Sequence, residues 1–445
     1  MSELKLAEII GALSHALDLT EGQPEGHCLR SCWIGMHIGE AMGMDATELW
    51  SLYYTLLLKD LGCSSNAARI CELYMADDRA FKHDLKLVRT GRRQLLGFMA
   101  AHSAPHARWR RRVMTLVGAA RNGGRFAQEM IETRCTRGAD IARRLRFPED
   151  VACAIHALDE HYDGSGRPMR LAAGAIPLAS RIALLAQVAD VFQFSHGPSA
   201  AAAEIRRRSG RWFDPKVVDA FMQVARSERF WTVLAQPDLA THVLALEPGD
   251  DAVPVDEDYL DAIAEAFGVV IDAKSPFTSG HSERVGYYTD GLALRLGIAP
   301  ARRRWLRRAA LLHDVGKLGV SNTILDKRGP LDEAEWTQVR MHAVHSEQIL
   351  SRITPFAELA RIAAAHHERL DGTGYPRGLH AEEIAMETRI ITTADIFDAI
   401  TAERPYHPPC SAERALDTMR AHVGTALDAD CFAALESMTG VAVAA

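Results

Sequence analysis

The C-terminal half of the sequence contains an ordered series of histidine and aspartate residues that could bind metal ions. His313 and Asp314 are adjacent, so an imidazole nitrogen and a carboxylate can reach the same point, and a carboxylate can also bridge two ions. Further candidates follow in order at His342, His366, His367 and Asp395. Nitrogen and oxygen ligands of this kind suit iron, manganese or zinc. The series therefore favours a metal centre in this half of the chain.

The elements that must position these residues are predicted to be helices. Apolar residues recur at three- and four-residue spacing through 6–17, 49–58, 259–270, 305–312 and 349–365. The segment 389–399 starts with β-branched residues, but its continuation has a helical pattern, so we predict a helix throughout. Clean alternating runs are scarce, and the predicted fold class is therefore all-α.

Length, charge and cysteine usage limit the kind of protein this can be. The 445 residues suffice for two or three domains, with 48% hydrophobic and 24% charged residues as in ordinary globular proteins. A net charge of -7 argues against a nucleic-acid polymer as the main partner, although a small anion could bind in a locally basic pocket. No run is long enough to span a bilayer, and the N-terminus lacks the layout of a signal peptide. With eight scattered cysteines, we expect a cytoplasmic protein with free thiols and no membrane partner.

The two halves of the chain resemble each other, which indicates a duplication. His27 aligns with His281 and Asp60 with Asp314, each 254 residues apart. Farther along, Asp163 aligns with Asp371, 208 residues apart. The change of offset predicts an insertion in the first copy, around 68–125. We therefore predict two tandem domains, 1–246 and 257–445, joined by a linker at 247–256 that is rich in Pro, Gly and Asp.

The C-terminal half, from about 259 to 435, resembles the HD-GYP family, the metal-dependent branch of the HD-superfamily phosphohydrolases. The motifs that carry the resemblance are His313-Asp314-Val315-Gly316-Lys317, His342, His366-His367-Glu368, Asp371-Gly372-Thr373-Gly374-Tyr375-Pro376, Asp395-Ile396-Phe397-Asp398-Ala399 and Arg404-Pro405-Tyr406. The resemblance implies an all-helical domain that holds two divalent metals, iron or manganese. The ligands that it implies are His313, Asp314, His342, His366, His367 and Asp395, with Asp314 bridging the two metals.

The resemblance also implies roles in catalysis. Two metals lower the pKa of a bridging water and hold a phosphodiester for in-line attack. Asp314 and Lys317 are the expected catalytic pair. Lys317 lies four residues after His313, so we expect it one helical turn farther on the same face, where it would stabilise negative charge at phosphorus. The expected substrate contacts are Lys317, Arg404, Asp398 and, as the weakest of the four, Tyr375.

One departure from the family pattern concerns the number of metals. Some members carry a glutamate four residues before the histidine that corresponds to His281, and that histidine helps them hold a third metal. Phe277 occupies the glutamate position here, and phenylalanine cannot bind a metal. We therefore expect a two-metal site with His281 outside the ligand set, supporting the ligands, although His281 as a further ligand stays open.

The first copy has lost most of the ligands. Lys59 stands where the second copy has His313, and Arg134 where it has His342. Leu158, Asp159 and Gln187 replace His366, His367 and Asp395. Only Asp60 survives, so a dinuclear site cannot form there. We expect Lys59 and Arg134 to pair with Asp60 or Asp159 in a structural role.

The resemblance implies that the C-terminal domain hydrolyses a cyclic dinucleotide through a metal-bridged hydroxide. It favours cyclic di-GMP as the substrate and linear pGpG as the product. His407, which stands where a basic residue is often found, keeps open the mixed cyclic GMP–AMP dinucleotide or another phosphoester as the substrate. A non-catalytic nucleotide sensor or scaffold is the second alternative. Homodimerisation, and a regulatory protein bound through the N-terminal domain, are further open possibilities.

Overall fold

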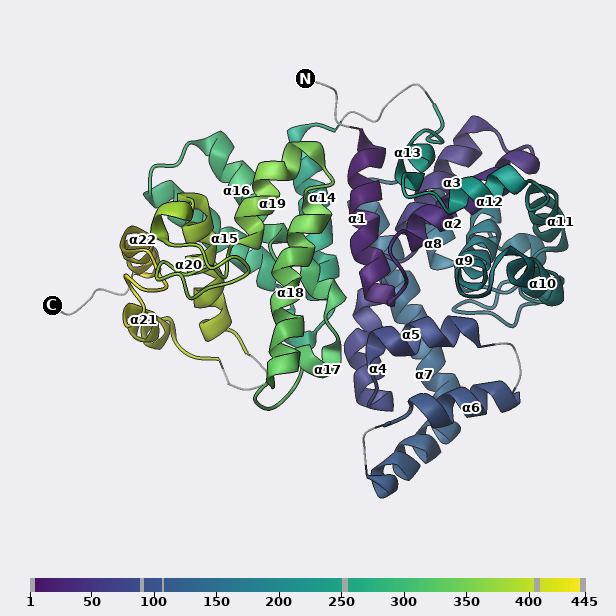
Figure 1. Cartoon of the computed structure of the whole chain (residues 1–445), viewed down its shortest axis with the longest axis horizontal. Helices are drawn as coiled ribbons and strands as arrows, with labels where there is room; N and C mark the ends of the chain where they lie inside the picture. Colours follow the sequence, from purple (N-terminus) through teal and green to yellow (C-terminus); the bar gives the residue numbers. More distant parts are fainter. Residues whose placement is uncertain (1–4, 89–91, 106–107, 250–254, 404–408, 441–445) are drawn as a thin grey trace. The chain divides into compact units, whose positions relative to one another are not determined.

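The computed structural model describes residues 5–88, 92–105, 108–249, 255–403 and 409–440, which form two compact units, Met1–Asp256 and Glu257–Ala445 (Figure 1). The described residues form helices joined by turns, and their β-pairing is limited to isolated bridges such as Asp371 with His380. The predicted all-α fold class is therefore confirmed. Within the described ranges, none of the helices is long and apolar enough to cross a membrane.

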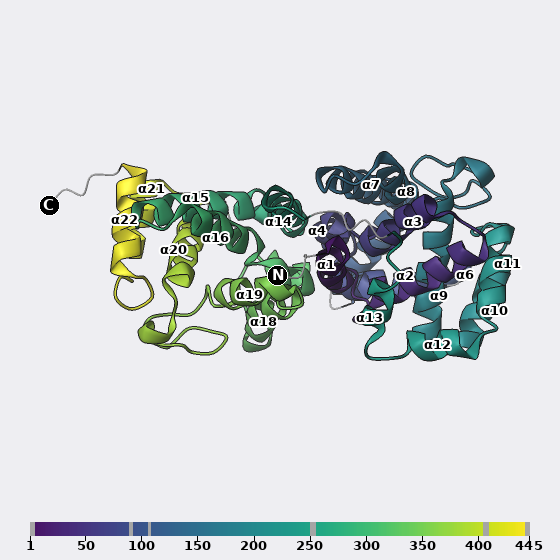
Figure 2. The same cartoon turned by 90° about the horizontal axis from the view of Figure 1, so that it is seen from above.

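The first unit is a bundle built around α2, which packs against α1, α3, α9, α11 and α13 (Figures 1 and 2). Its α-helices are α1 Leu6–Glu21, α2 His27–Ala41, α3 Ala46–Leu58, α4 Ala67–Tyr74, α5 Asp78–Leu87, α6 Arg92–His102, α7 Trp109–Arg144, α8 Glu149–His156, α9 Leu178–His196, α10 Pro198–Arg208, α11 Pro215–Val224, α12 Glu228–Leu234 and α13 Leu239–Leu244. The short 3-10 helices η1 Cys63–Asn66 and η2 Ala173–Ala175 lie between them.

The segment predicted as an insertion forms α4, α5, α6 and the first part of α7. It has an apolar cluster of its own, in which Tyr74, Phe81 and Phe98 are buried with Ile70. The ring centroids of Tyr74 and Phe81 are 4.6 Å apart, and those of Phe81 and Phe98 are 5.0 Å apart. Aromatic pairs at this spacing favour a fixed arrangement beyond the area that they bury. The segment is thus a small helical layer rather than an irregular loop.

The second unit repeats the packing of the first. Its α-helices are α14 Glu257–Asp272, α15 His281–Arg295, α16 Pro300–Leu312, α17 Asn322–Leu325, α18 Glu333–Leu350, α19 Ala357–Ala364, α20 Met386–Thr401, α21 Ala412–Arg420 and α22 Ala429–Thr439. The 3-10 helices are η3 Pro276–Thr278, η4 Val315–Gly319, η5 Thr354–Phe356 and η6 Ala381–Glu383. α15 packs on α16 and α20 as α2 packs on α3 and α9, and α18 packs on α19 as α7 packs on α8. The shared pattern agrees with the duplication seen in the sequence.

Two of the helix predictions can be compared in detail. The segment 389–399 lies inside α20, so its assignment as a helix is confirmed. The single helix expected over 349–365 is wrong, because α18 ends at Leu350 and α19 begins only at Ala357. Pro355 lies between them, and a proline disfavours the helical conformation of the residue that precedes it. This break sets the direction of α19, which leads into His366 and His367.

Candidate metal centre

Five helical elements bring seven histidine and aspartate side chains to one point in the second unit. His313 is the C-cap of α16, and Asp314 follows it directly. His342 lies inside α18 and Asp395 inside α20. His366 and His367 follow the end of α19, and His281 is the first residue of α15. Apart from His367, which is partly exposed, these side chains are buried. The structure therefore brings together all six residues expected as ligands.

Three of the histidines are oriented by the backbone of the turn that precedes them. The Nδ1 atoms of His313, His342 and His366 each lie 2.6 Å from the carbonyl oxygen three residues earlier. A carbonyl oxygen can only accept, so Nδ1 carries the proton in all three rings. The Nε2 lone pair is then free to bind a metal, and the contact fixes the direction in which the ring points.

Asp314 has the geometry of a bridging carboxylate. Its Oδ1 lies 3.4 Å from Nε2 of His342 and 3.7 Å from Nε2 of His366. Its Oδ2 lies 3.3 Å from Nε2 of His313 and 3.4 Å from Nε2 of His281. The two oxygens of one buried side chain therefore face two different groups of imidazoles.

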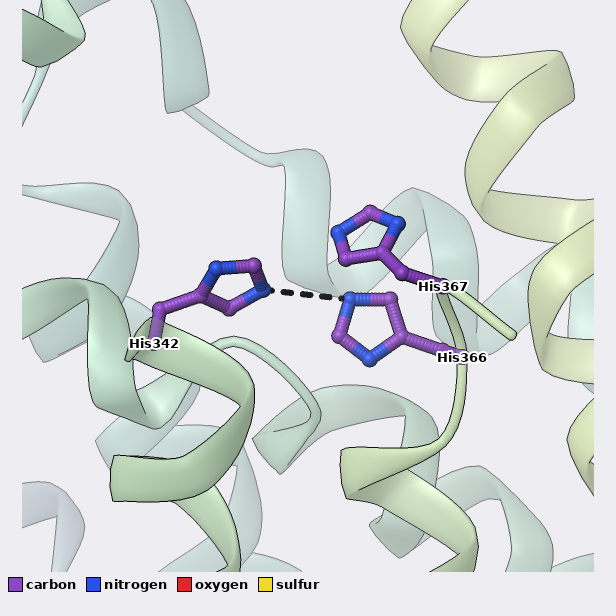
Figure 3. A group of neighbouring side chains, drawn as sticks. All are labelled: His342, His366 and His367. Atoms are coloured by element: carbon purple, nitrogen blue, oxygen red, sulfur yellow. Dashed lines mark hydrogen bonds between the residues drawn. The ribbon is translucent and has the colours of Figure 1, made fainter. Parts of the chain in front are cut away.

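The ligand atoms form two groups, which Asp314 connects. One comprises His342, His366 and His367, whose rings converge from α18 and from the end of α19 (Figure 3). The other comprises His281, His313 and Asp395, and the ligand atoms of each group lie within 4.8 Å of one another. Asp314 joins them, since it also forms a group with His313 and His366. Two groups that share a carboxylate fit two metal ions.

His281 belongs to this arrangement more closely than the sequence suggested. We expected it outside the ligand set, but its Nε2 lies 3.3 Å from Oδ1 of Asp395 as well as beside Asp314. Its Nδ1 lies 2.7 Å from Oδ2 of Asp398, and this contact aims Nε2 at the centre. Burial would lower the pKa of His281, but Asp314, Asp395 and Asp398 outweigh it and raise that pKa to about 10.

Asp398, one of the expected substrate contacts, has its carboxylate held by two neighbouring side chains. Its carboxylate is 1% exposed, and both oxygens are engaged. Oδ2 accepts from His281, and Oδ1 accepts from Nε of Arg284 at 2.5 Å. Its contacts make it a positioning residue for His281. Arg404, the other expected phosphate contact, lies outside the described residues, and so does His407.

The protonation states of the donors also fit divalent cations. Burial lowers the pKa of His342 to about 4 and that of His367 to about 3, so both imidazoles are neutral at pH 7. Burial would raise the pKa of Asp314 and Asp395, but His313, His281 and, for Asp314, Lys317 hold both well below the usual range. Nε2 of His313 and Oδ1 of Asp314 are buried and make no hydrogen bond within the described ranges. Neutral imidazoles and ionised carboxylates that face one another in this way are a metal donor set.

Lys317 reaches the centre by a different route from the one expected. α16 ends at Leu312, and Lys317 lies in η4, so it is not one α-helical turn beyond His313 on the same helix. The tighter 3-10 turn instead carries its Nζ to 2.5 Å from Oδ2 of Asp314. The side chain is 19% exposed, so its charge lies at the open edge of the centre.

Tyr375 and Arg340 lie at the same edge. The ring of Tyr375 is 4.7 Å from that of His367 and 6.3 Å from that of His342. The guanidinium of Arg340 lies over the rings of Tyr375 and Trp336, at 5.7 and 5.9 Å from their centroids. The sequence prediction missed Arg340. Arg340 lies two residues before His342 on α18, and residues at this spacing do not share a helix face, so no signal for it was visible in the sequence.

The loop that contains Tyr375 is held by a residue to which the sequence prediction gave no role. Glu368 is buried, and its carboxylate accepts hydrogen bonds from the backbone nitrogens of Arg377 and Leu379, at 2.7 and 2.9 Å. Gly374 is required there because a Cβ would overlap the backbone of Glu368 and Arg369. In the first unit Glu160 accepts in the same way from Met169 and Leu171. Because the first unit keeps this carboxylate–backbone contact without the ligands, the contact stabilises the fold of the loop rather than the metal site.

Ion pairs occupy the corresponding position in the first unit. Lys59 pairs with Asp60 and Arg134 with Asp159, as the sequence predicted, and Lys59 and Asp60 are both buried. Glu21, Asp60 and Cys63 lie close enough to hold a metal, but Glu21 pairs with Lys86 at 2.7 Å. Burial raises the pKa of the Cys63 thiol well above its usual value. Cations thus take the place that metals would have, and the pairing compensates the buried carboxylates.

The support around the centre is nevertheless the same in both units. Nδ1 of His27 lies 2.7 Å from Oδ2 of Asp190, and Nε of Arg30 donates to Oδ1 at 2.7 Å. These contacts match those of His281 and Arg284 with Asp398. The first copy has therefore kept the support and lost the ligands.

Comparison with known proteins agrees with this geometry. Residues 111–217 and 266–431 match the model of the HD domain family. The chain is 55% identical to "3′3′-cGAMP-specific phosphodiesterase 3" of Vibrio cholerae, over 97% of this chain and 94% of that protein. It is 38% identical to a cyclic di-GMP phosphodiesterase of Thermotoga maritima, over 36% of this chain and 44% of that protein. The crystal structure of a cyclic GMP-AMP-specific phosphodiesterase of V. cholerae is similar, with a TM-score of 0.69, 49% identity and 99% coverage of both chains. The chain therefore belongs to the HD domain family, whose members bind divalent metals, and its resemblance to tandem HD-GYP proteins is confirmed.

Proposed function

We propose that the second unit hydrolyses a phosphodiester bond of the mixed cyclic GMP–AMP dinucleotide and releases a linear dinucleotide. The observation that carries the proposal is the placement of Asp314, whose two oxygens face two separate groups of imidazole Nε2 atoms. The proposed ligands of two iron or manganese ions are His313, Asp314, His342, His366, His367 and Asp395, and His281 is a further ligand of the group that contains Asp395.

Divalent ions held by these residues would supply activation of a water molecule and neutralisation of charge on the phosphate. The residues of the chain set the geometry for that chemistry. The carbonyl contacts at Nδ1 keep three imidazoles facing the centre, and Asp398 does the same for His281. Lys317 places a positive charge at the edge of the centre, where it can contact a phosphate oxygen. Arg340 lies at the same edge and can contact the second phosphate.

Relatives support the choice of substrate. The sequence favoured cyclic di-GMP, with the mixed dinucleotide as an alternative. The relative that matches almost the whole chain carries a name specific for 3′3′-cGAMP, whereas the cyclic di-GMP enzyme of T. maritima matches about a third of the chain. Hydrolysis of a cyclic dinucleotide is common to both names, and the chain is a metal-dependent cyclic dinucleotide phosphodiesterase. The mixed dinucleotide is therefore the substrate we propose.

We also propose that catalysis is confined to 257–445. The experiment compares matched variants of the full chain, Asp314→Asn and Asp60→Asn, which are the equivalent residues of the two copies. Each is loaded with Mn²⁺ or with Fe²⁺ under anaerobic conditions and incubated with 3′3′-cGAMP, cyclic di-GMP and cyclic di-AMP, and the products are separated by chromatography.

We expect Asp314→Asn to abolish turnover and Asp60→Asn to keep it. Wild type should give the highest kcat/KM with the mixed dinucleotide and a linear product. Failure of a metal-loaded wild type to cleave any of the three substrates would refute the proposal. Equal activity on all three would refute the choice of substrate, and loss of activity in Asp60→Asn would refute a non-catalytic first unit.

A further inference from the structure

One cavity borders the metal centre, a second of nearly equal size lies on the far side of His281, and Phe277 lines both. The first has a volume of about 560 Å³ and reaches Asp314, Lys317 and His281. The second has a volume of about 550 Å³ and reaches Arg284 and Asp398, which support His281 from the side opposite the centre. Volumes of this size are typical of small-molecule sites. The side chain of Phe277 is the wall that the two cavities share.

The turn that carries Phe277 is held in place on both sides. Oγ of Ser275 donates to Oδ1 of Asp326 at 2.5 Å and accepts from the backbone nitrogen of Phe277 at 3.2 Å. On the other side, Oγ1 of Thr278 donates to the carbonyl oxygen of Asp272 at 3.0 Å. Phe277 is only partly buried, so these contacts and not core packing fix its position. An aromatic ring on a fixed turn can divide a site into two compartments.

The two cavities differ in chemistry. The first is mostly apolar, with Ile324, Leu331 and Val339 in its walls, and Trp336 at its edge is 42% exposed. Trp336 is therefore available to stack on a planar ligand. The second contains charged and hydroxyl groups, among them Arg284, Thr401 and Glu403. A carboxylate such as that of Glu403 accepts hydrogen bonds from the amino groups of nucleobases.

We propose that each cavity takes one nucleoside of the cyclic dinucleotide, that Phe277 keeps the two bases apart, and that Trp336 stacks on the base in the first cavity. This inference rests on the proposed function and extends it to substrate choice. A symmetric dinucleotide must place the same base in two unlike cavities, whereas a mixed one can match each cavity separately. Phe277, Trp336 and Glu403 are therefore specificity-determining residues, and Phe277 has a role beyond the absence of a metal-binding glutamate.

The experiment measures kcat and KM of the Mn²⁺-loaded full chain with 3′3′-cGAMP, cyclic di-GMP and cyclic di-AMP. The variants are Phe277→Ala, Trp336→Ala and Glu403→Gln, with Phe277→Leu as a milder replacement should the alanine variant fold poorly. Tyr287→Ala is the control, because Tyr287 is a 66% exposed aromatic residue of the same unit that lines neither cavity. Turnover of bis(p-nitrophenyl) phosphate, which has no nucleobase, reports whether the metal centre of each variant is intact.

Stacking on an aromatic side chain contributes about 1–3 kcal/mol per base, so Trp336→Ala should raise KM for the mixed dinucleotide by about 5- to 150-fold. Relative to its own turnover of bis(p-nitrophenyl) phosphate, Phe277→Ala should lose most of its preference for the mixed substrate. Glu403→Gln should raise KM with little change in kcat. If all three variants kept the wild-type KM and the wild-type preference for the mixed dinucleotide, the assignment of the two cavities to the two nucleosides would be overturned. A wild type that cleaves bis(p-nitrophenyl) phosphate but no cyclic dinucleotide would overturn the proposed function, and this inference with it.

Discussion

Asp398→Asn should weaken metal binding without removing a ligand. Oδ2 of Asp398 accepts from Nδ1 of His281 at 2.7 Å and from Nη2 of Arg284 at 3.1 Å, and Oδ1 accepts from Nε of Arg284 at 2.5 Å. An asparagine has a single oxygen, so its amide nitrogen must face one of these donors. The ring of His281 then loses the contact that aims Nε2 at Asp314 and Asp395, to which it lies at 3.4 and 3.3 Å.

Loss of such a supporting contact typically costs 10- to 100-fold in metal affinity, which corresponds to about 1.4–2.7 kcal/mol. The first unit provides a matched control. Asp190 holds His27 and Arg30 through the same contacts, but Lys59, Arg134 and Gln187 stand there at positions where the second unit has ligands. Asp190→Asn should therefore lower the free energy of unfolding, since it disturbs a buried ion pair, and leave metal affinity unchanged.

The assay is calorimetric titration of chelator-treated protein with Mn²⁺, with the bound metal counted per chain and helical content checked by circular dichroism. We expect a higher dissociation constant for Asp398→Asn and the wild-type value for Asp190→Asn. Wild-type affinity in Asp398→Asn would refute the positioning role of this residue. An equal loss in both variants would show that the effect reflects the stability of the chain rather than the orientation of His281.

Three further predictions concern the buried charges, the packing and the metals. Lys59→Met should lower the free energy of unfolding of the first unit by about 3–5 kcal/mol in urea, because Asp60 stays buried without its cation. The double variant Lys59→Met/Asp60→Leu should recover most of this stability. A loss of less than about 1 kcal/mol in Lys59→Met would contradict the argument. Gly316→Ala should abolish activity, because the added Cβ would overlap the carbonyl oxygen of His342. The equivalent Gly62→Ala in the first unit should lower stability but leave activity unchanged. An equal loss of activity in the two variants would count against this reasoning. Chelation of the metals should abolish turnover and lower the melting temperature. Mn²⁺ or Fe²⁺ should restore both properties and Ca²⁺ should not, because the ligands are mainly nitrogen atoms. Full activity in a sample shown by elemental analysis to be metal-free would disprove the metal dependence.

Much of the centre could be predicted from the sequence because only a few residue types can bind a metal ion. Imidazole and carboxylate groups cannot be replaced by apolar ones, so His313, Asp314 and their partners remain visible as an ordered series. The repeat was visible for a related reason. The first copy kept residues that support the fold, such as Glu160 and Asp190, while its ligand positions changed, and the constant offsets survived.

The tertiary structure decided where the side chains point and what lies between them. His281 and Asp398 were both seen in the sequence, but only their 2.7 Å contact shows that one positions the other. Lys317 reaches Asp314 because α16 ends early, a detail that depends on packing rather than on helical periodicity. The residue types of the second copy were therefore sufficient by themselves to predict a metal centre there. Whether Phe277 merely lacks a ligand or divides two cavities depends on the packing of α18 and α20, which supply distant parts of the cavity walls, and sequence spacing does not encode that packing.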